Sequence, residues 1–250
     1  MEIREDQITH GIRERVATIV GSRGPIPLAA WSPAEGRGSQ LILVGHGASG
    51  SKMEGYVVAL ARSLVRTHGC CVVAIDGPVH GERRSDGHTG STLPFLEFAQ
   101  RWSADESLTD DMVSDWRETL DAVLAAEWVD NDAEVGYWGL SMGTILGLPF
   151  VAAEPRVRAA VLGLMGAAGP TRERLVSDAA SVTVPVLFLV QYDDELVARE
   201  DAITLFGLLG SSDKTMIMSP GAHGAVTAES FRRSAEFLAD RLSQVVSGSY

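Results

Sequence analysis

A serine flanked by glycines is the residue of this 250-residue chain best suited to act as a nucleophile. Ser141 stands in the segment Gly139-Leu140-Ser141-Met142-Gly143, between a predicted buried strand over Ala133–Trp138 and a predicted helix over Met142–Ala153. A serine on so tight a strand-to-helix turn needs small neighbours, because the backbone passes close to itself there. The first N–H groups of the helix also favour the negative charge that develops when the hydroxyl attacks a carbonyl. The pattern therefore predicts Ser141 as a nucleophile.

A serine hydroxyl needs a base to activate it, and the chain offers six histidines. His223 follows the last predicted strand, Thr215–Met218, in a loop with glycine on both sides. By contrast, His10 and His68 fall at exposed or helix-end positions, and His88 falls in a polar loop. We therefore predict that His223 is the base.

A carboxylate should orient that histidine, and three acids follow the predicted strand Val184–Val190. They are Asp193, Asp194 and Glu195. The spacing favours Asp194, because an apolar residue follows it three positions later at the start of a helix. Asp193 is the second choice, and Glu195 is expected to be solvated.

The segment Gly45–Gly50 supports a competing interpretation, a dinucleotide-binding oxidoreductase. It matches G-x-G-x-x-G between a predicted strand and a predicted helix, and Asp76 ends the next strand. However, Asp76 lies 26 residues beyond Gly50 (76 − 50), whereas the ribose contact normally follows after about 20. A dehydrogenase also has no need of a serine turn, an acid turn and a histidine loop in this order.

Short apolar runs alternate with helical patterns, which predicts an α/β fold with a mostly parallel sheet and helices on both faces. Such sheets hold ligands at the carboxyl ends of their strands, where the three candidate residues stand. The segment Gly77–Leu108 is different, being rich in Gly, Pro, Ser and charge, and we expect it to line or cover the pocket. The predicted strands are Ile12–Val20, Ile26–Ala30, Leu41–Val44, Cys70–Ile75, Ala133–Trp138, Ala159–Leu164, Val184–Val190 and Thr215–Met218. The predicted helices are Met53–Thr67, Leu93–Trp102, Thr109–Val129, Met142–Ala153, Arg199–Leu209 and Ala228–Val246.

The order Ser141, Asp194, His223 is the nucleophile–acid–base order of α/β hydrolases, and the chain resembles that superfamily from about residue 12 to 246. Its compact core is similar to those of small esterases and dienelactone hydrolases. The resemblance implies one α/β-hydrolase domain over residues 1–250 and a carboxylic ester hydrolase for small to medium esters, with lactones or thioesters as further candidates. Dienelactone hydrolases use a cysteine nucleophile, so the serine favours plain ester hydrolysis. Many relatives insert a lid domain where this chain has only about residues 165–183, so no large lid is expected.

The same resemblance implies an oxyanion hole made of two backbone N–H groups. One belongs to Met142, the residue after the nucleophile, and the other to Ala48 in the loop Gly45–Gly50. A non-catalytic, hydrolase-like binding protein is a further alternative, although the chain retains every catalytic residue type.

Four residues are predicted to lie on the substrate side of the site: His46, Gly47, His80 and Met165. His46 is expected to shape its loop by hydrogen bonding rather than to act in catalysis. His80 belongs to a turn that begins at Asp76, and similar turns in relatives organise the loop beside the pocket. Asp76 and His80 are residue types that can bind a metal, but two ligands without a third nearby are weak evidence for a metal site. The proposed chemistry needs no metal or organic cofactor.

The composition limits the partners. The net charge is −12, from 21 basic and 33 acidic residues, which argues against a nucleic acid because phosphate binding needs clustered Lys and Arg. Cys70 and Cys71 are adjacent in an apolar run, and we expect buried thiols rather than a strained disulfide. The charged start Met1–Asp6 does not resemble a signal peptide, and no run has the roughly 18 apolar residues of a membrane span. We therefore expect a cytoplasmic protein with a small-molecule ester substrate, and the oligomeric state stays open.

Overall fold

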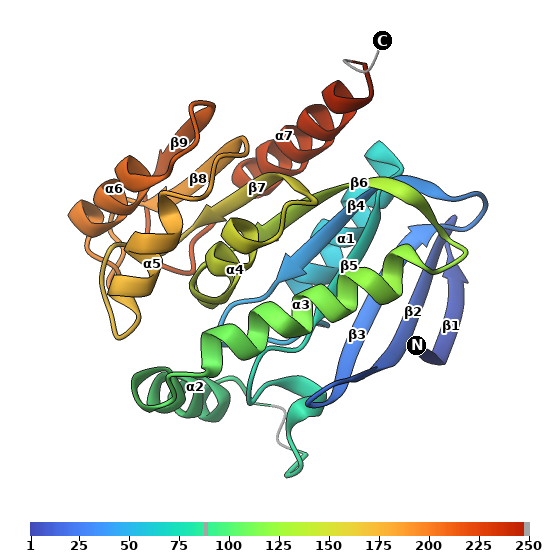
Figure 1. The fold of residues 1–250 in the computed structure, drawn as a ribbon, viewed down its shortest axis with the longest axis horizontal. Coiled ribbons are helices and arrows are strands. Elements are labelled where there is room, and N and C mark those ends of the chain that lie inside the picture. The colour runs from blue at the N-terminus through green and yellow to red at the C-terminus, as the bar shows by residue number, and fades with distance from the viewer. Residues whose placement is uncertain (88–89, 248–250) are drawn as a thin grey trace.

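A nine-stranded sheet runs through the computed structural model, which describes residues 1–87 and 90–247 (Figure 1). The strand order is β1-β2-β3-β5-β4-β6-β7-β8-β9. Strands β4 to β9 are mutually parallel, and β1, β2 and β3 join them as an antiparallel edge. The strands are β1 (Glu2–Thr9), β2 (Ile12–Gly21), β3 (Gly24–Pro33), β4 (Gly38–Gly45), β5 (Cys71–Ile75), β6 (Val129–Gly139), β7 (Val157–Gly163), β8 (Val186–Gln191) and β9 (Lys214–Ser219).

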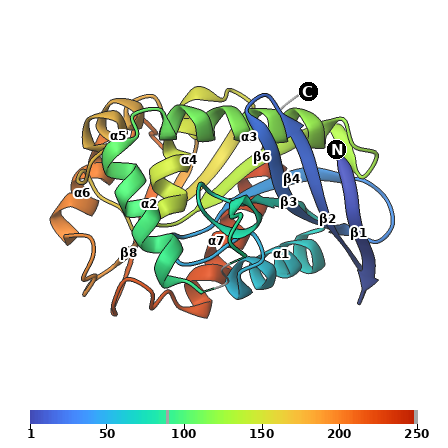
Figure 2. The same ribbon diagram turned by 90° about the horizontal axis from the view of Figure 1, so that it is seen from below.

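Helices cover both faces of the sheet. Helices α1 and α7 pack together on one face, and α3, α4, α5 and α6 pack in sequence on the other (Figures 1 and 2). This arrangement confirms the predicted α/β fold. The helices are α1 (Gly55–His68), α2 (Thr92–Ala104), α3 (Leu108–Leu124), α4 (Met142–Ala153), α5 (Arg172–Ala179), α6 (Arg199–Leu208) and α7 (Ala228–Ser247), with a short 3₁₀ turn at Gly81–Arg83.

The central strands are apolar throughout because both of their faces are covered. In β4, Leu41 and Leu43 belong to the core under α3 and α4, whereas Ile42 and Val44 belong to the core under α1 and α7. Successive side chains of a strand point to opposite faces, so a continuous apolar run serves both cores. Packing on both faces thereby holds the strands in place, and the carboxyl ends of these strands carry the candidate site.

Two elements are absent from the sequence-based prediction. Every residue of β1 is exposed, so this edge strand carries no apolar alternation. Helix α5 lies in the segment 165–183, where only Leu175 and Ala179 of the helix are buried. The predicted helix Thr109–Val129 is also too long: α3 ends at Leu124, and β6 begins at Val129.

The segment Gly77–Leu108 contains the 3₁₀ turn and α2, which matches the predicted short helix closely. Helix α2 lies apart from the two helical layers, as seen from below in Figure 2. Its buried residues, Pro94 and Phe98, face the rest of the molecule. No helix in the described part of the chain is long and apolar enough to cross a membrane.

Candidate active site

Ser141 occupies a strained turn between β6 and α4. Its backbone has φ 57° and ψ −118°, a conformation that costs energy in a residue with a side chain. The turn is held from the neighbouring strand, because the N–H of Ser141 donates to the carbonyl of Gly163 at 3.0 Å. The Thr144 hydroxyl adds further bonds to backbone atoms of Gly139 and Gly163. The strain therefore presents the serine hydroxyl above the carboxyl edge of the sheet.

Both flanking glycines are required by close backbone packing. A Cβ atom on Gly139 would lie 2.6 Å from the carbonyl oxygen of Gly143, and one on Gly143 would collide with the carbonyl of Gly45. Helix α4 can thus approach β4 and β6 only because these positions lack side chains. The sequence-based argument for small residues around Ser141 agrees with this geometry.

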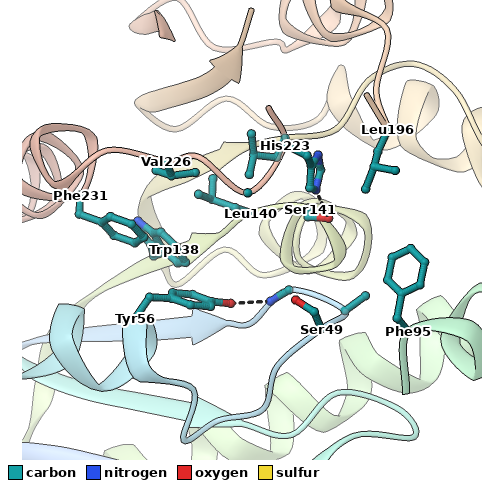
Figure 3. A pocket seen from close by; sticks show the side chains of 14 residues that line it. Ser49, Tyr56, Phe95, Trp138, Leu140, Ser141, Leu196, His223, Val226 and Phe231 are labelled. Carbon is teal, nitrogen blue, oxygen red and sulfur yellow. Dashed lines mark hydrogen bonds between the residues drawn. The ribbon is translucent and has the colours of Figure 1, made fainter. Parts of the chain in front are cut away.

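His223 links Ser141 to Asp194 in a continuous chain of hydrogen bonds. The Nε2 atom of His223 lies 2.9 Å from Oγ of Ser141 (Figure 3), and its Nδ1 atom lies 2.8 Å from Oδ2 of Asp194. The Asp194 side chain is 4% exposed and that of His223 is 13% exposed. Oδ1 of Asp194 also accepts the N–H groups of Leu196 and Val197, at 2.8 and 2.9 Å. These two backbone hydrogen bonds therefore fix the orientation of the carboxylate that contacts the imidazole.

The two acids beside Asp194 hold the histidine loop rather than the imidazole ring. Asp193 accepts the N–H of Gly221 at 3.2 Å, and Glu195 accepts the N–H of His223 at 2.8 Å. This hydrogen bond from the backbone of His223 lowers the pKa of Glu195. Glu195 is exposed, as expected, but its contact with His223 is missed by sequence reasoning, which treats it as merely solvated.

The loop after β4 brings Ala48 beside Ser141. The backbone N–H groups of Ala48 and Met142 donate no hydrogen bond to any atom in the described part of the chain. Met142 is the first residue of α4, and a helix leaves its first N–H groups without internal partners. Both N–H groups are free donors, and Ala48 and Met142 line the cleft together with Ser141.

His46 and His80 are buried behind this loop and do not line the cleft. Nε2 of His46 accepts the N–H of Gly77 at 2.8 Å, and its Nδ1 lies 2.8 Å from the carbonyl of Gly47. The ring nitrogens of His80 lie 2.6 and 2.7 Å from the carbonyls of Pro78 and Ala48. Burial, with the neighbouring His80, lowers the pKa of His46 to about 4, and burial lowers the pKa of His80. Both side chains therefore brace the loop that carries Ala48, while Gly47 and Met165 do face the cleft.

Asp76 forms a buried ion pair that leaves no carboxylate free for a ribose. Its Oδ2 lies 2.7 Å from Nζ of Lys52, which lies 2.6 Å from Glu82. The backbone N–H groups of Lys52 and Glu82 also donate to the Asp76 carboxylate, at 3.0 and 2.9 Å. Asp76 is fully buried, so the acid required by the dinucleotide interpretation is occupied in bracing two loops. No group of three metal-ligating side chains occurs among the residues that the structure describes.

The site lies in a cleft with two lobes, which meet at Ser141. Both lobes share Ala48, Phe95, Ser141, Leu164, Leu196 and His223. The first lobe has a volume of about 400 Å³ and adds Gly47, Ser49, Tyr56, Trp138, Leu140, Gly224, Val226 and Phe231 (Figure 3). The second lobe has a volume of about 440 Å³ and adds Phe98, Ala99, Trp102, Met142, Ile145, Met165, Ala168, Gly169, Val197, Ala198 and Asp201. Helix α2 supplies Phe95, Phe98 and Trp102, so the segment Gly77–Leu108 does line the cleft.

Known structures resemble the whole chain. No family model and no curated protein matches it. A cold-adapted esterase from an Arctic intertidal metagenomic library is 37% identical over 96% of this chain and 99% of that one, with a TM-score of 0.86. An acetyl xylan esterase from Paenibacillus sp. R4 (18% identity, 96% and 87% of the two chains, TM-score 0.71) shares the fold. So does a putative dienelactone hydrolase from Klebsiella pneumoniae subsp. pneumoniae (16% identity, 93% and 99%, TM-score 0.74). Because the first of these relatives is so similar from end to end, the chain belongs to the α/β-hydrolase superfamily, with the esterases.

Proposed function

We propose that the chain is a serine esterase that cleaves small to medium carboxylic esters through an acyl-enzyme on Ser141. The observation that carries the proposal is the hydrogen-bonded series from Ser141 through His223 to Asp194. Hydrolase activity is suggested independently by the similarity to a cold-adapted esterase. The acyl-enzyme, the role of each residue and the substrate range go beyond that similarity.

In the first step, Oγ of Ser141 attacks the ester carbonyl while Nε2 of His223 accepts the hydroxyl proton. Asp194 stabilises the imidazolium that forms and keeps the ring in the required orientation. The oxyanion is held by the N–H groups of Met142 and Ala48. One such donor typically contributes about 3–4 kcal/mol to transition-state stabilisation.

The tetrahedral intermediate then breaks its bond to the alcohol oxygen, which leaves with the proton from His223. In the second step, His223 accepts a proton from water, and the resulting hydroxide attacks the acyl carbon bound to Ser141. Collapse of the second intermediate releases the carboxylic acid and returns the proton to Oγ. Two steps with one base account for the complete hydrolysis without any further co-reactant.

The geometry favours Asp194 over Asp193 as the acid. Asp194 is nearly buried and contacts the imidazole, whereas the Asp193 carboxylate is bonded to the backbone of Gly221. The three-residue spacing that favours Asp194 in the sequence has a physical counterpart, since its Oδ1 caps the N–H of Val197. We therefore propose Asp194 as the third member of a triad with Ser141 and His223.

The two lobes of the cleft support the proposed substrate size. Their volumes of about 400 and 440 Å³ are enough for a modest acyl or alcohol group, and apolar side chains dominate both walls. The short helix α5 fills the segment where a lid domain is inserted in many relatives. Esters with two compact halves fit such a site, and lactones and thioesters remain further candidates.

Turnover of p-nitrophenyl esters by Ser141→Ala tests the proposal. We expect this variant to fold and to lose at least about 10⁴-fold in kcat, because removal of the nucleophile abolishes acyl transfer. Ser49→Ala is the matched control: its hydroxyl lies in the same cleft, but His223 bonds Ser141, so most of the turnover should remain. Retained turnover in Ser141→Ala would remove the basis for the assignment. An inert binding protein would instead show no ester turnover even as the wild type.

A further inference from the structure

The two lobes of the cleft differ in charge. Apart from the shared catalytic residues, the first lobe has no ionisable side chain except Tyr56, whose hydroxyl accepts the N–H of Gly47 at 2.7 Å. Apart from the shared residues, the second lobe is lined by apolar and aromatic residues together with one acidic residue, Asp201. An acid at the wall of an apolar pocket is costly unless it interacts with a partner. Asp201 is therefore the feature of the second lobe that calls for an explanation.

Asp201 lies in the first turn of α6, and its backbone is fixed by the segment that follows β7. Its carbonyl accepts the N–H of Ala167 at 2.9 Å, and a Cβ atom on Gly166 would lie 2.6 Å from Asp201, so the two segments are in close contact. Its carboxylate has no hydrogen bond and no ion pair with any residue that the structure describes. The neighbouring Glu200 differs, because it is exposed, lies outside both lobes and pairs with Arg199 at 3.4 Å.

Three aromatic residues of α2 line the same lobe, namely Phe95, Phe98 and Trp102. The rings of Phe98 and Trp102 are stacked, with centroids 6.1 Å apart and 13° between their planes. Nε1 of Trp102 donates to the hydroxyl of Thr171 at 2.8 Å, and the indole lies so close to Gly169 that a Cβ atom there would collide with it. The indole is thereby held in place before a ligand arrives. The face of an aromatic ring attracts cations, and Trp does so most strongly.

We propose that the second lobe binds the half of the substrate that carries a positively charged alkylammonium group. Asp201 supplies the counter-charge, and Trp102 supplies an aromatic ring in the same lobe. The net charge of −12 adds a long-range attraction for cations, although it does not select a lobe. This inference rests on the proposed ester hydrolysis at Ser141 and names the class of ester: a cationic ester with an apolar second half in the first lobe.

Matched pairs of substrates test the inference. Each pair consists of an ester with a trimethylammonium group and its uncharged tert-butyl isostere, with the charge in the alcohol or in the acyl half and with graded spacer lengths. We expect the wild type to favour the cationic ester in one of these series by about tenfold in kcat/KM, a size typical of a half-exposed ion pair combined with a cation–π contact. The preference should decrease as salt is added.

Two variants, each of which removes one negative charge, distinguish an effect of the second lobe from an effect of the overall charge. Asp201→Asn should lower the cation-to-isostere ratio severalfold and leave only the contribution of the Trp102 ring, whereas Glu200→Gln removes the same charge one residue away and should leave the ratio unchanged. An equal fall in both variants would attribute the preference to net charge and overturn the inference. An unchanged ratio in Asp201→Asn, or no preference in the wild type, would also overturn it. Ester turnover that persists in Ser141→Ala would instead contradict the proposed function itself.

Discussion

Among the residues that the structure describes, three histidines lie near the carboxyl edge of the sheet, and His223 differs from the other two in exposure and in its partners. His223 stands on a loop with its side chain 13% exposed, and its two ring nitrogens contact two other side chains, Ser141 and Asp194. His46 and His80 are buried, and their ring nitrogens contact backbone atoms alone. The same side chain thus contacts the proposed nucleophile in one place and braces a loop in the other.

The difference follows from whether the histidine at each position can exchange protons with groups in the cleft. A general base must exchange protons with the nucleophile and the leaving group, so it has to reach the cleft. A buried imidazole is held neutral, because burial disfavours its charged form, and the pKa of His46 accordingly falls to about 4. Neutral His46 donates from Nδ1 to the carbonyl of Gly47 and accepts the N–H of Gly77 at Nε2, which suits it to bracing a backbone turn. The buried pair therefore braces the loop of Ala48, whereas His223 is the histidine that we propose as the base.

Replacing one histidine from each group should separate loss of chemistry from loss of stability. His223→Ala is expected to lower kcat/KM by at least about 10⁴-fold, since no base then accepts the Ser141 proton. His80→Ala should instead lower the free energy of unfolding by about 2–4 kcal/mol, because it leaves a cavity and unpaired carbonyls. Steady-state kinetics and urea unfolding measure the two effects. A stable, fully active His223→Ala would erase the distinction between the two groups.

The acids that contact the histidine loop provide a second, somewhat smaller contrast. Asp194→Asn should lower kcat about 10⁴-fold, because an amide no longer stabilises the imidazolium or fixes its tautomer. Asp193→Asn changes the adjacent acid, whose exposed bond to Gly221 contributes at most about 1.5 kcal/mol, so kcat should fall by less than about tenfold. Kinetics on the two variants decide between the two acids. The reverse ranking would make Asp193 the catalytic acid.

The pH dependence of stability should reveal the buried histidine. The pKa of His46 is about 4 in the folded protein and near 6.5 in the unfolded chain, so the unfolded chain binds more protons between these values. The contribution of His46 to stability is therefore complete above about pH 6.5 and is lost as the pH falls toward 4, by up to about 3 kcal/mol. Urea unfolding of the wild type and His46→Gln should show a smaller loss in the variant. An equal loss of the free energy of unfolding in the two proteins would mean that protonation of His46 does not destabilise the folded state.

The sequence predicts those parts of the site that local pattern controls. The glycines around Ser141 are needed by a turn within five residues, and the apolar strands before Ser141, Asp194 and His223 place all three at one edge of the sheet. The limits of α4 are predicted to the residue, because the turn at Ser141 fixes its start. Spacing alone also favours Asp194, whose carboxylate is the one that contacts the imidazole.

The remaining features depend on contacts between distant segments. Burial of His80 depends on Ala48, 32 residues earlier in the chain, and no local pattern distinguishes it from a residue that faces substrate. Glu195 resembles a solvated acid until its contact with the backbone of His223, 28 residues away, is known. Strand β1 has no apolar face, since its partner β2 covers only one edge of it and its side chains stay exposed. These errors therefore concern tertiary pairing rather than local conformation.

Trapping of a covalent intermediate tests the central claim most directly. The wild type is mixed with an excess of a p-nitrophenyl ester, quenched with acid within the first turnovers, digested and analysed by mass spectrometry. We predict that the peptide containing Ser141 gains the mass of the acyl group, together with a burst of about one p-nitrophenol per chain, because the acyl-enzyme forms before water releases it. An acyl group on another residue would contradict the account. Ester turnover in a variant that lacks the Ser141 hydroxyl would contradict it too.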